Sequence, residues 1–100
     1  MIYIGEYKEL NPHSDFPSMR DSFEAKAYEG KKRIVQYLKT GTPDMVSFCL
    51  PKDVFTGEPI HMTPTGMNDG VYTWFNTLAY YVEKYNLRLP IDFEKHILES

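Results

Sequence analysis

The spacing of apolar and polar residues changes along this chain, and each spacing predicts a different kind of element. The opening stretch MIYIGEYKE is rich in β-branched and aromatic residues, which favours a strand. The stretch LNPHSDFPS that follows carries two prolines together with Asn, Ser and Asp, a mixture typical of a loop. Residues 19–30 fit both a helical and an extended pattern, so both alternatives stay open.

The middle of the chain predicts a short helix and then a buried strand. Apolar residues at helical spacing predict a helix from Lys31 to Lys39, and Thr40-Gly41 is a typical C-terminal stop. The stretch TGTP indicates a loop. Residues 45–51, MVSFCLP, are a short apolar run between turn sequences, which is typical of a strand buried in the core.

Two turn sequences, TGEP and NDG, then predict a small meander. Both contain Gly, which accepts the positive φ that such turns require. NDG comes directly before residues 71–73 and predicts a hairpin. The expected partner strand is residues 60–63, with Pro64 and Gly66 in a longer connecting loop.

The C-terminal third changes to a helical period. Its apolar stripe predicts a helix that begins at Trp74 or Phe75 and ends at Asn86. The Pro of the LP pair at 89–90 is pre-set for a first helical turn, so a second, short helix follows. Two apolar residues four positions apart should dock that helix on the core: Phe93 and Ile97.

The order of these elements predicts the fold class. We expect a single α+β domain over residues 1–100. It should contain a small, mostly antiparallel sheet of about three to five strands, with two or three helices packed on one face. The alternation of strands and helices is not the regular one of a doubly wound parallel sheet.

Composition and charge narrow the classes of partner. The net charge of −3 and the isoelectric point near 5.5 argue against a nucleic-acid partner, which a basic surface would attract. No apolar run approaches the roughly 20 residues that cross a bilayer, so no membrane partner is expected. The single cysteine excludes an internal disulfide, and MIYIGEYKEL lacks a signal-peptide pattern, so we expect a cytoplasmic location.

The aromatic stretch NDGVYTWFNTLAYYVEKYN is the first candidate for a binding site. Most of its rings fall on the predicted core stripe, but Tyr80 falls on the opposite side among Asn76, Glu83 and Lys84. An exposed Tyr with polar neighbours is typical of a protein interface. An exposed Tyr without any function is the commoner alternative.

Candidate chemistry is sparse. Cys49 and His61 are the only pair that could supply a thiol nucleophile and its base. However, Cys49 lies in an apolar run, which predicts a buried cysteine with a structural role. His13, His61 and His96 lack the spacing of metal ligands, so no metal and no cofactor is expected. No catalytic residue is assigned.

Three acidic and basic residues have expected structural roles. Asp53 and Asp69 should bind the backbone of their own turns. His96 should face solvent and contact Asp92 one helical turn before it.

The C-terminal half resembles a group of small, uncharacterised bacterial proteins. The resemblance rests on DVFTGEPI, DGVYTW and LAYYVEKYNLRLPIDFEKHI, which together span residues 53–97. It implies no activity and therefore assigns no role to any residue.

These observations favour a non-enzymatic protein-interaction module. Its partner would be a second copy or another protein, and an acidic inhibitor or immunity protein for a basic toxin is one specific form. The alternative is an enzyme or small-molecule-binding protein with a pocket. Its expected lining residues are Tyr72, Trp74, His61 and Cys49.

Overall fold

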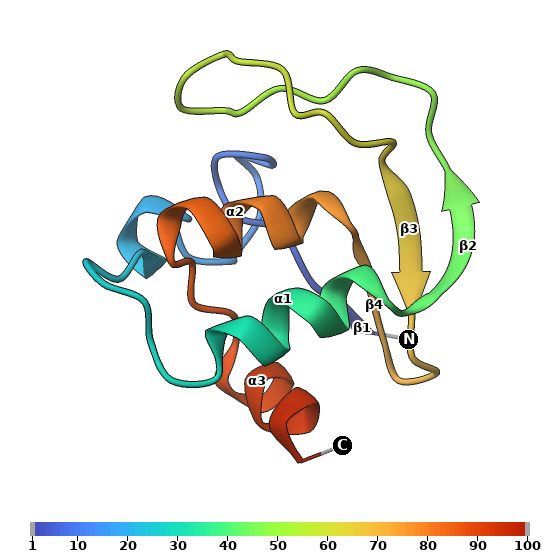
Figure 1. The fold of residues 1–100 in the computed structure, drawn as a ribbon. Helices are drawn as coiled ribbons and strands as arrows, with labels where there is room; N and C mark the ends of the chain where they lie inside the picture. The colour runs from blue at the N-terminus through green and yellow to red at the C-terminus, as the bar shows by residue number, and fades with distance from the viewer. Residues whose placement is uncertain (1, 100) are drawn as a thin grey trace.

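The computed structural model describes residues 2–99 and contains a four-stranded mixed sheet and three α-helices (Figure 1). The strands are β1 (Ile2–Tyr3), β2 (Thr42–Val46), β3 (Thr65–Asn68) and β4 (Tyr72–Phe75). The helices are α1 (Lys31–Lys39), α2 (Thr77–Tyr85) and α3 (Ile91–Leu98). The predicted α+β class is confirmed.

The sheet has the order β1-β4-β3-β2. β4 pairs antiparallel with β3, and β3 pairs antiparallel with β2, whereas β1 joins β4 in parallel. The sheet is therefore mostly antiparallel, and β2 is an edge strand. A Cβ at Gly66 of β3 would lie 2.8 Å from Oδ1 of Asp44 on β2, so the exposed Asp44 side chain would have to move aside to admit one.

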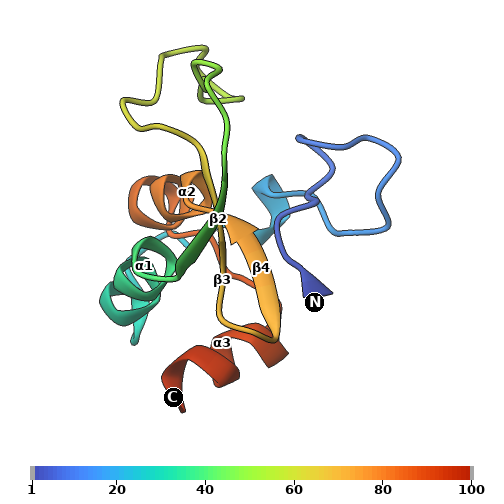
Figure 2. The same cartoon turned by 90° about the vertical axis from the view of Figure 1, so that its right-hand side faces the viewer.

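One face of the sheet is covered by helices. Trp74 of β4 is fully buried, and its indole Nε1 donates a hydrogen bond of 2.9 Å to the carbonyl of Leu38 in α1. The ring of Tyr72 lies 4.7 Å from the ring of Phe93 in α3. Figure 2 shows α1 and α2 together on one side of the strands. A Trp this large, with its single donor satisfied, fixes the position of α1 on the sheet.

The other face carries a different set of residues. Directly paired residues on neighbouring strands point to the same face, so Met45, Gly66 and Phe75 form a row across β2, β3 and β4. Tyr3 of β1 extends this row, since its ring packs edge-on against Phe75 at 6.5 Å. The N-terminal segment borders this side of the sheet, away from α1 and α2 (Figure 2).

Several predicted boundaries are confirmed. α1 spans the predicted residues, and α2 ends at Asn86, which adopts the left-handed conformation with φ 57°. α3 begins directly after Pro90, and it buries Phe93 and Ile97 completely. Asn86 and Pro90 mark the last two boundaries by their own backbone preferences.

The hairpin is placed differently from the prediction. The partner of β4 is β3 (Thr65–Asn68), and residues 60–63 are not part of it. The NDG turn therefore joins the two strands directly, with Gly70 at φ 91°. Trp74 and Phe75 belong to β4 and not to a helix. The sequence pattern does not separate the two, because aromatic residues at these positions fit a short strand and a helical stripe equally well.

Three other predictions are wrong or fall short. The buried strand over residues 45–51 is replaced by β2, an exposed edge strand that ends at Val46. Residues 19–30 are neither helix nor strand, apart from a short 3₁₀ turn at Arg20–Ser22 and one bridge from Phe23. The strand predicted from Met1 reaches only Ile2–Tyr3, and Met1 itself lies outside the described residues.

Between residues 2 and 99, none of the helices combines the length and the apolar character needed to cross a bilayer.

Candidate functional site

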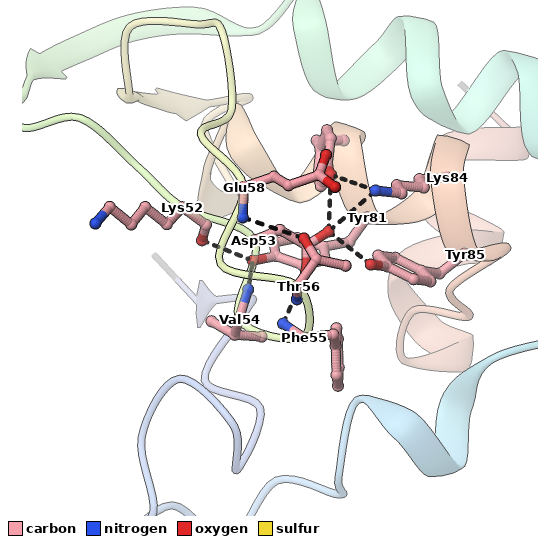
Figure 3. Close-up of polar contacts among 10 residues, drawn as sticks. Lys52, Asp53, Val54, Phe55, Thr56, Glu58, Tyr81, Lys84 and Tyr85 are labelled. Carbon is pink, nitrogen blue, oxygen red and sulfur yellow. Dashed lines mark hydrogen bonds and ion pairs between the residues drawn. The ribbon is translucent and has the colours of Figure 1, made fainter.

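Asp53 is the centre of the largest polar cluster. It lies in the turn of residues 53–57, within the long segment that joins β2 to β3. Its Oδ1 accepts the backbone N–H groups of Phe55 at 2.7 Å and of Thr56 at 3.2 Å (Figure 3). The predicted turn role of Asp53 is confirmed.

The second carboxylate oxygen of Asp53 faces α2. Oδ2 accepts the hydroxyls of Tyr80 at 2.7 Å and Tyr85 at 2.6 Å, and the ammonium of Lys84 lies 3.5 Å away. Figure 3 shows Lys84 and Tyr85 pointing from the helix toward this aspartate. Asp53 is 1% exposed, so a buried carboxylate with every lone pair in use fastens the turn to the helix.

The charge states in this cluster are fixed at neutral pH. Burial by itself would raise the pKa of Asp53, but the hydroxyls of Tyr85 and Tyr80 and the two turn amides lower it to about 2. Burial and the hydrogen bond to Asp53 raise the pKa of Tyr85 to about 12. The hydrogen bond to Tyr80 raises the pKa of Lys84. A group that keeps one protonation state on both sides of neutral pH is a poor general acid or base.

Tyr80 is therefore not the exposed residue that the sequence predicts. It is half-buried, and its hydroxyl binds Asp53 and Lys84 of the same chain. The sequence could not reveal this, because Asp53 lies 27 positions before Tyr80.

The other residues expected beside Tyr80 are also engaged within the chain. Asn76 accepts the N–H of Thr65 at 2.9 Å and donates to the carbonyl of Thr63 at 3.0 Å. Glu83 lies 3.5 Å from Lys39 in an exposed ion pair. Together with Lys84, these residues hold neighbouring segments of the fold.

Asp69 repeats the design of Asp53 at the β3–β4 turn. Its Oδ1 accepts the N–H groups of Val71 and Tyr72, at 2.9 and 2.7 Å, which confirms the predicted turn role. Its Oδ2 accepts the hydroxyl of Tyr37 at 2.5 Å and lies 2.8 Å from Nε2 of His96. His96 thus faces Asp69 and the Tyr72 ring, 4.9 Å away, in place of the predicted Asp92.

Cys49 and His61 lie in a different part of the molecule from Tyr72 and Trp74. Both line a shallow hollow on the long β2–β3 segment. Cys49 is exposed, so the predicted buried cysteine is wrong, because the chain leaves the sheet at Ser47. Trp74 is buried under α1, and the half-buried Tyr72 packs against Phe93 of α3. The four residues expected to line one pocket are divided between two places.

The most exposed apolar surface follows β2. We call Met45, Val46, Phe48 and Leu50 the 45–50 patch. Their exposed fractions are 59%, 48%, 95% and 67%. The apolar composition of residues 45–51 predicts a core strand, so this surface is not foreseen from the sequence. The sequence does contain one signal for an exposed strand here. Prolines lie at both ends of the segment, Pro43 and Pro51, and they favour an edge strand over a central one.

The described residues offer no evident metal site, since residues 2–99 contain no group of three His, Cys, Asp or Glu side chains able to hold an ion. The chain matches no family model, and comparison with curated proteins and with solved structures gives no match either.

Proposed function

We propose that this protein is a non-enzymatic protein-binding module whose contact surface is the 45–50 patch. The observation that carries the proposal is Phe48, whose side chain is 95% exposed. Burying one aromatic side chain removes about 150–250 Å² from water. Met45, Val46 and Leu50 add further exposed apolar area along the same segment, and apolar surface of a few hundred Å² typically marks an interaction site on a soluble protein.

The location of the patch supports this role. Its residues lie on an edge strand and on the segment that follows, and this segment projects beyond the ends of β2 and β3 (Figures 1 and 2). A projecting apolar surface can reach a partner without any rearrangement of the core.

The polar clusters support the non-enzymatic part of the proposal. Asp53 and Asp69 each use one oxygen for a backbone turn and the other for tyrosine hydroxyls. Their lowered pKa values, about 2 in both cases, leave them unable to exchange a proton near neutral pH.

Site-specific photo-crosslinking in cells tests this function. A photoreactive phenylalanine analogue replaces Phe48 in one variant and Ile91 in a matched control. Ile91 is also a strongly exposed apolar residue, 69% exposed, but it lies on α3 at the opposite end of the molecule (Figure 1). We expect a discrete protein adduct at position 48 and none at position 91.

The adduct at position 48 should also weaken when Leu50→Ser removes the neighbouring apolar group. Equal adducts at both positions, or none at position 48, would contradict the proposed function.

A further inference from the structure

An unfilled apolar hollow lies beside the 45–50 patch. It has a volume of about 190 Å³ and lies between β1 and the β2–β3 segment. Its lining includes Tyr3, Leu10, Cys49, Phe75, Leu78 and Tyr81. Tyr3 and Phe75 contribute to the hollow from the face of the sheet opposite Trp74, and Leu78 and Tyr81 contribute from α2.

The size of the hollow matches a single aromatic ring. A cavity of about 150 Å³ lined by apolar side chains is large enough to bind benzene. Pockets for larger organic ligands usually measure about 300–1,000 Å³ and contain several polar groups that orient the ligand. Here the hydroxyl of Tyr81 accepts the N–H of Val54 at 3.1 Å and donates to the carbonyl of Lys52 at 3.4 Å, so it is already in use within the chain. The hollow therefore suits an apolar side chain better than a polar small molecule.

The chain itself carries a side chain of this kind. Phe48 is almost fully exposed, and the residue after it, Cys49, lines the hollow. When a projecting group and a cavity lie close together on one surface, two copies related by a two-fold axis can each insert the group into the cavity of the other. The result is a closed dimer. If they lay on opposite sides of the molecule, the same contact would produce an open fibre.

Strand addition is a weaker alternative for the same surface. Pro43 has no N–H to donate from β2. Val46 opposes Thr65, whose own N–H and C=O bind Asn76, so the backbone groups of Val46 face away from β3. The register shift between Pro43 and Met45 interrupts this edge further, so side-chain insertion is the stronger contact.

We propose that the partner is a second copy of this chain, and that Phe48 of each copy inserts into the apolar hollow of the other. This inference rests on the proposed function, because it assigns the 45–50 patch a partner. The dimer would contain two identical contacts, each formed by Phe48 of one copy and the hollow of the other.

Sedimentation equilibrium of the purified protein tests the dimer. Phe48→Ala removes the projecting group and keeps the hollow, whereas Leu10→Asp places a charge in the hollow and keeps Phe48. Both residues are exposed, Leu10 by 47%, so both variants should fold, which their melting curves verify. We expect each substitution to weaken dimerisation by about tenfold or more, and Ile91→Ala to leave it unchanged.

Mixing the two variants gives the decisive arm. A heterodimer of Phe48→Ala with Leu10→Asp restores one of the two contacts, so the mixture should associate more strongly than either variant alone. A general loss of folding in the variants would not produce this rescue.

Two results would overturn the dimer. They are a wild-type protein that stays monomeric up to about 1 mM, and a Phe48→Ala variant that dimerises normally. If the crosslinking at position 48 still captured another protein, the proposed function would survive the first of these results. If crosslinking failed as well, both proposals would fall.

Discussion

Two surfaces of this molecule that carry aromatic side chains differ in how far contacts within the chain engage those side chains. On α2, Tyr80 and Tyr85 direct their hydroxyls at the buried carboxylate of Asp53. On the β2–β3 segment, Phe48 and Leu50 expose almost all of one side chain and two thirds of the other. Both surfaces are rich in apolar atoms, but only the side chains of the first form hydrogen bonds within the chain.

The difference follows from the chemistry of the side chains. A Tyr near the surface can satisfy its polar tip with a carboxylate of its own chain and still pack its ring. A Phe has no polar tip, and an exposed one forgoes the roughly 2 kcal/mol that its burial would contribute. The two half-buried tyrosines are thus accounted for by contacts within the chain, whereas the ring of Phe48 stays almost fully exposed.

The largest expected effect comes from removing the carboxylate on the α2 side. Asp53→Ala leaves two turn amides and two tyrosine hydroxyls without their acceptor. We expect the free energy of unfolding to fall by roughly 3 kcal/mol, as measured by urea denaturation.

The matched control is Glu58→Ala, which removes an exposed acid of the same turn region. It should change the free energy of unfolding by less than about 0.5 kcal/mol. Equal effects of the two substitutions would mean that the Asp53 cluster does not hold the turn on α2.

Acid should act on the same cluster. Asp53 titrates at about 2 in the folded protein and at an ordinary value near 3.8 when unfolded. A lowered pKa contributes stability above 3.8, and this contribution is lost as the pH falls toward 2. We expect the stability advantage of the wild type over Asp53→Asn to shrink by about 2 kcal/mol across this window. An advantage that stays constant down to pH 2 would show that the carboxylate is not held as an anion.

A smaller effect is expected from a single hydroxyl. Tyr85→Phe keeps the ring, which stacks on Phe23 at 4.8 Å, and removes one hydrogen bond to Asp53. Urea denaturation should show a loss of about 1 kcal/mol. A loss of several kcal/mol would mean that the substitution disturbs ring packing as well as the hydrogen bond.

The smallest effect on folding belongs to the 45–50 patch. Phe48→Ala, measured at a dilution where the protein is monomeric, should change the free energy of unfolding by less than about 0.5 kcal/mol. The reason is that an exposed ring leaves no cavity when it is removed. A loss above about 1 kcal/mol would place Phe48 in the folded core and remove the contrast with Tyr85.

The sequence predicts those elements whose ends carry local signals. The left-handed Asn86 and the Pro before α3 each mark a boundary by their own backbone preferences. The turns at Asp53 and Asp69 were equally local, because each side chain binds amides two and three residues further on. These features need no knowledge of the rest of the fold.

The features that the sequence missed depend on distant contacts. Residues 45–50 have the composition of a core strand, but Met45 and Val46 lie on an edge strand and the residues after them have left the sheet, which leaves them exposed. Trp74 fits a helical stripe as well as a strand, until its indole donates to Leu38, 36 positions away. Tyr80 looks free until the turn of Asp53 folds against α2. Tertiary structure decides each of these cases.

The rate at which a thiol reagent labels Cys49, measured over a range of protein concentrations, tests the role of the 45–50 patch most directly. Cys49 is the only cysteine, it is exposed in the monomer, and it lines the hollow that the partner copy's Phe48 would fill. We expect fast labelling in dilute solution and several-fold slower labelling in concentrated solution, with no such slowing in Phe48→Ala. A wild-type rate that is independent of concentration would contradict self-association through this patch.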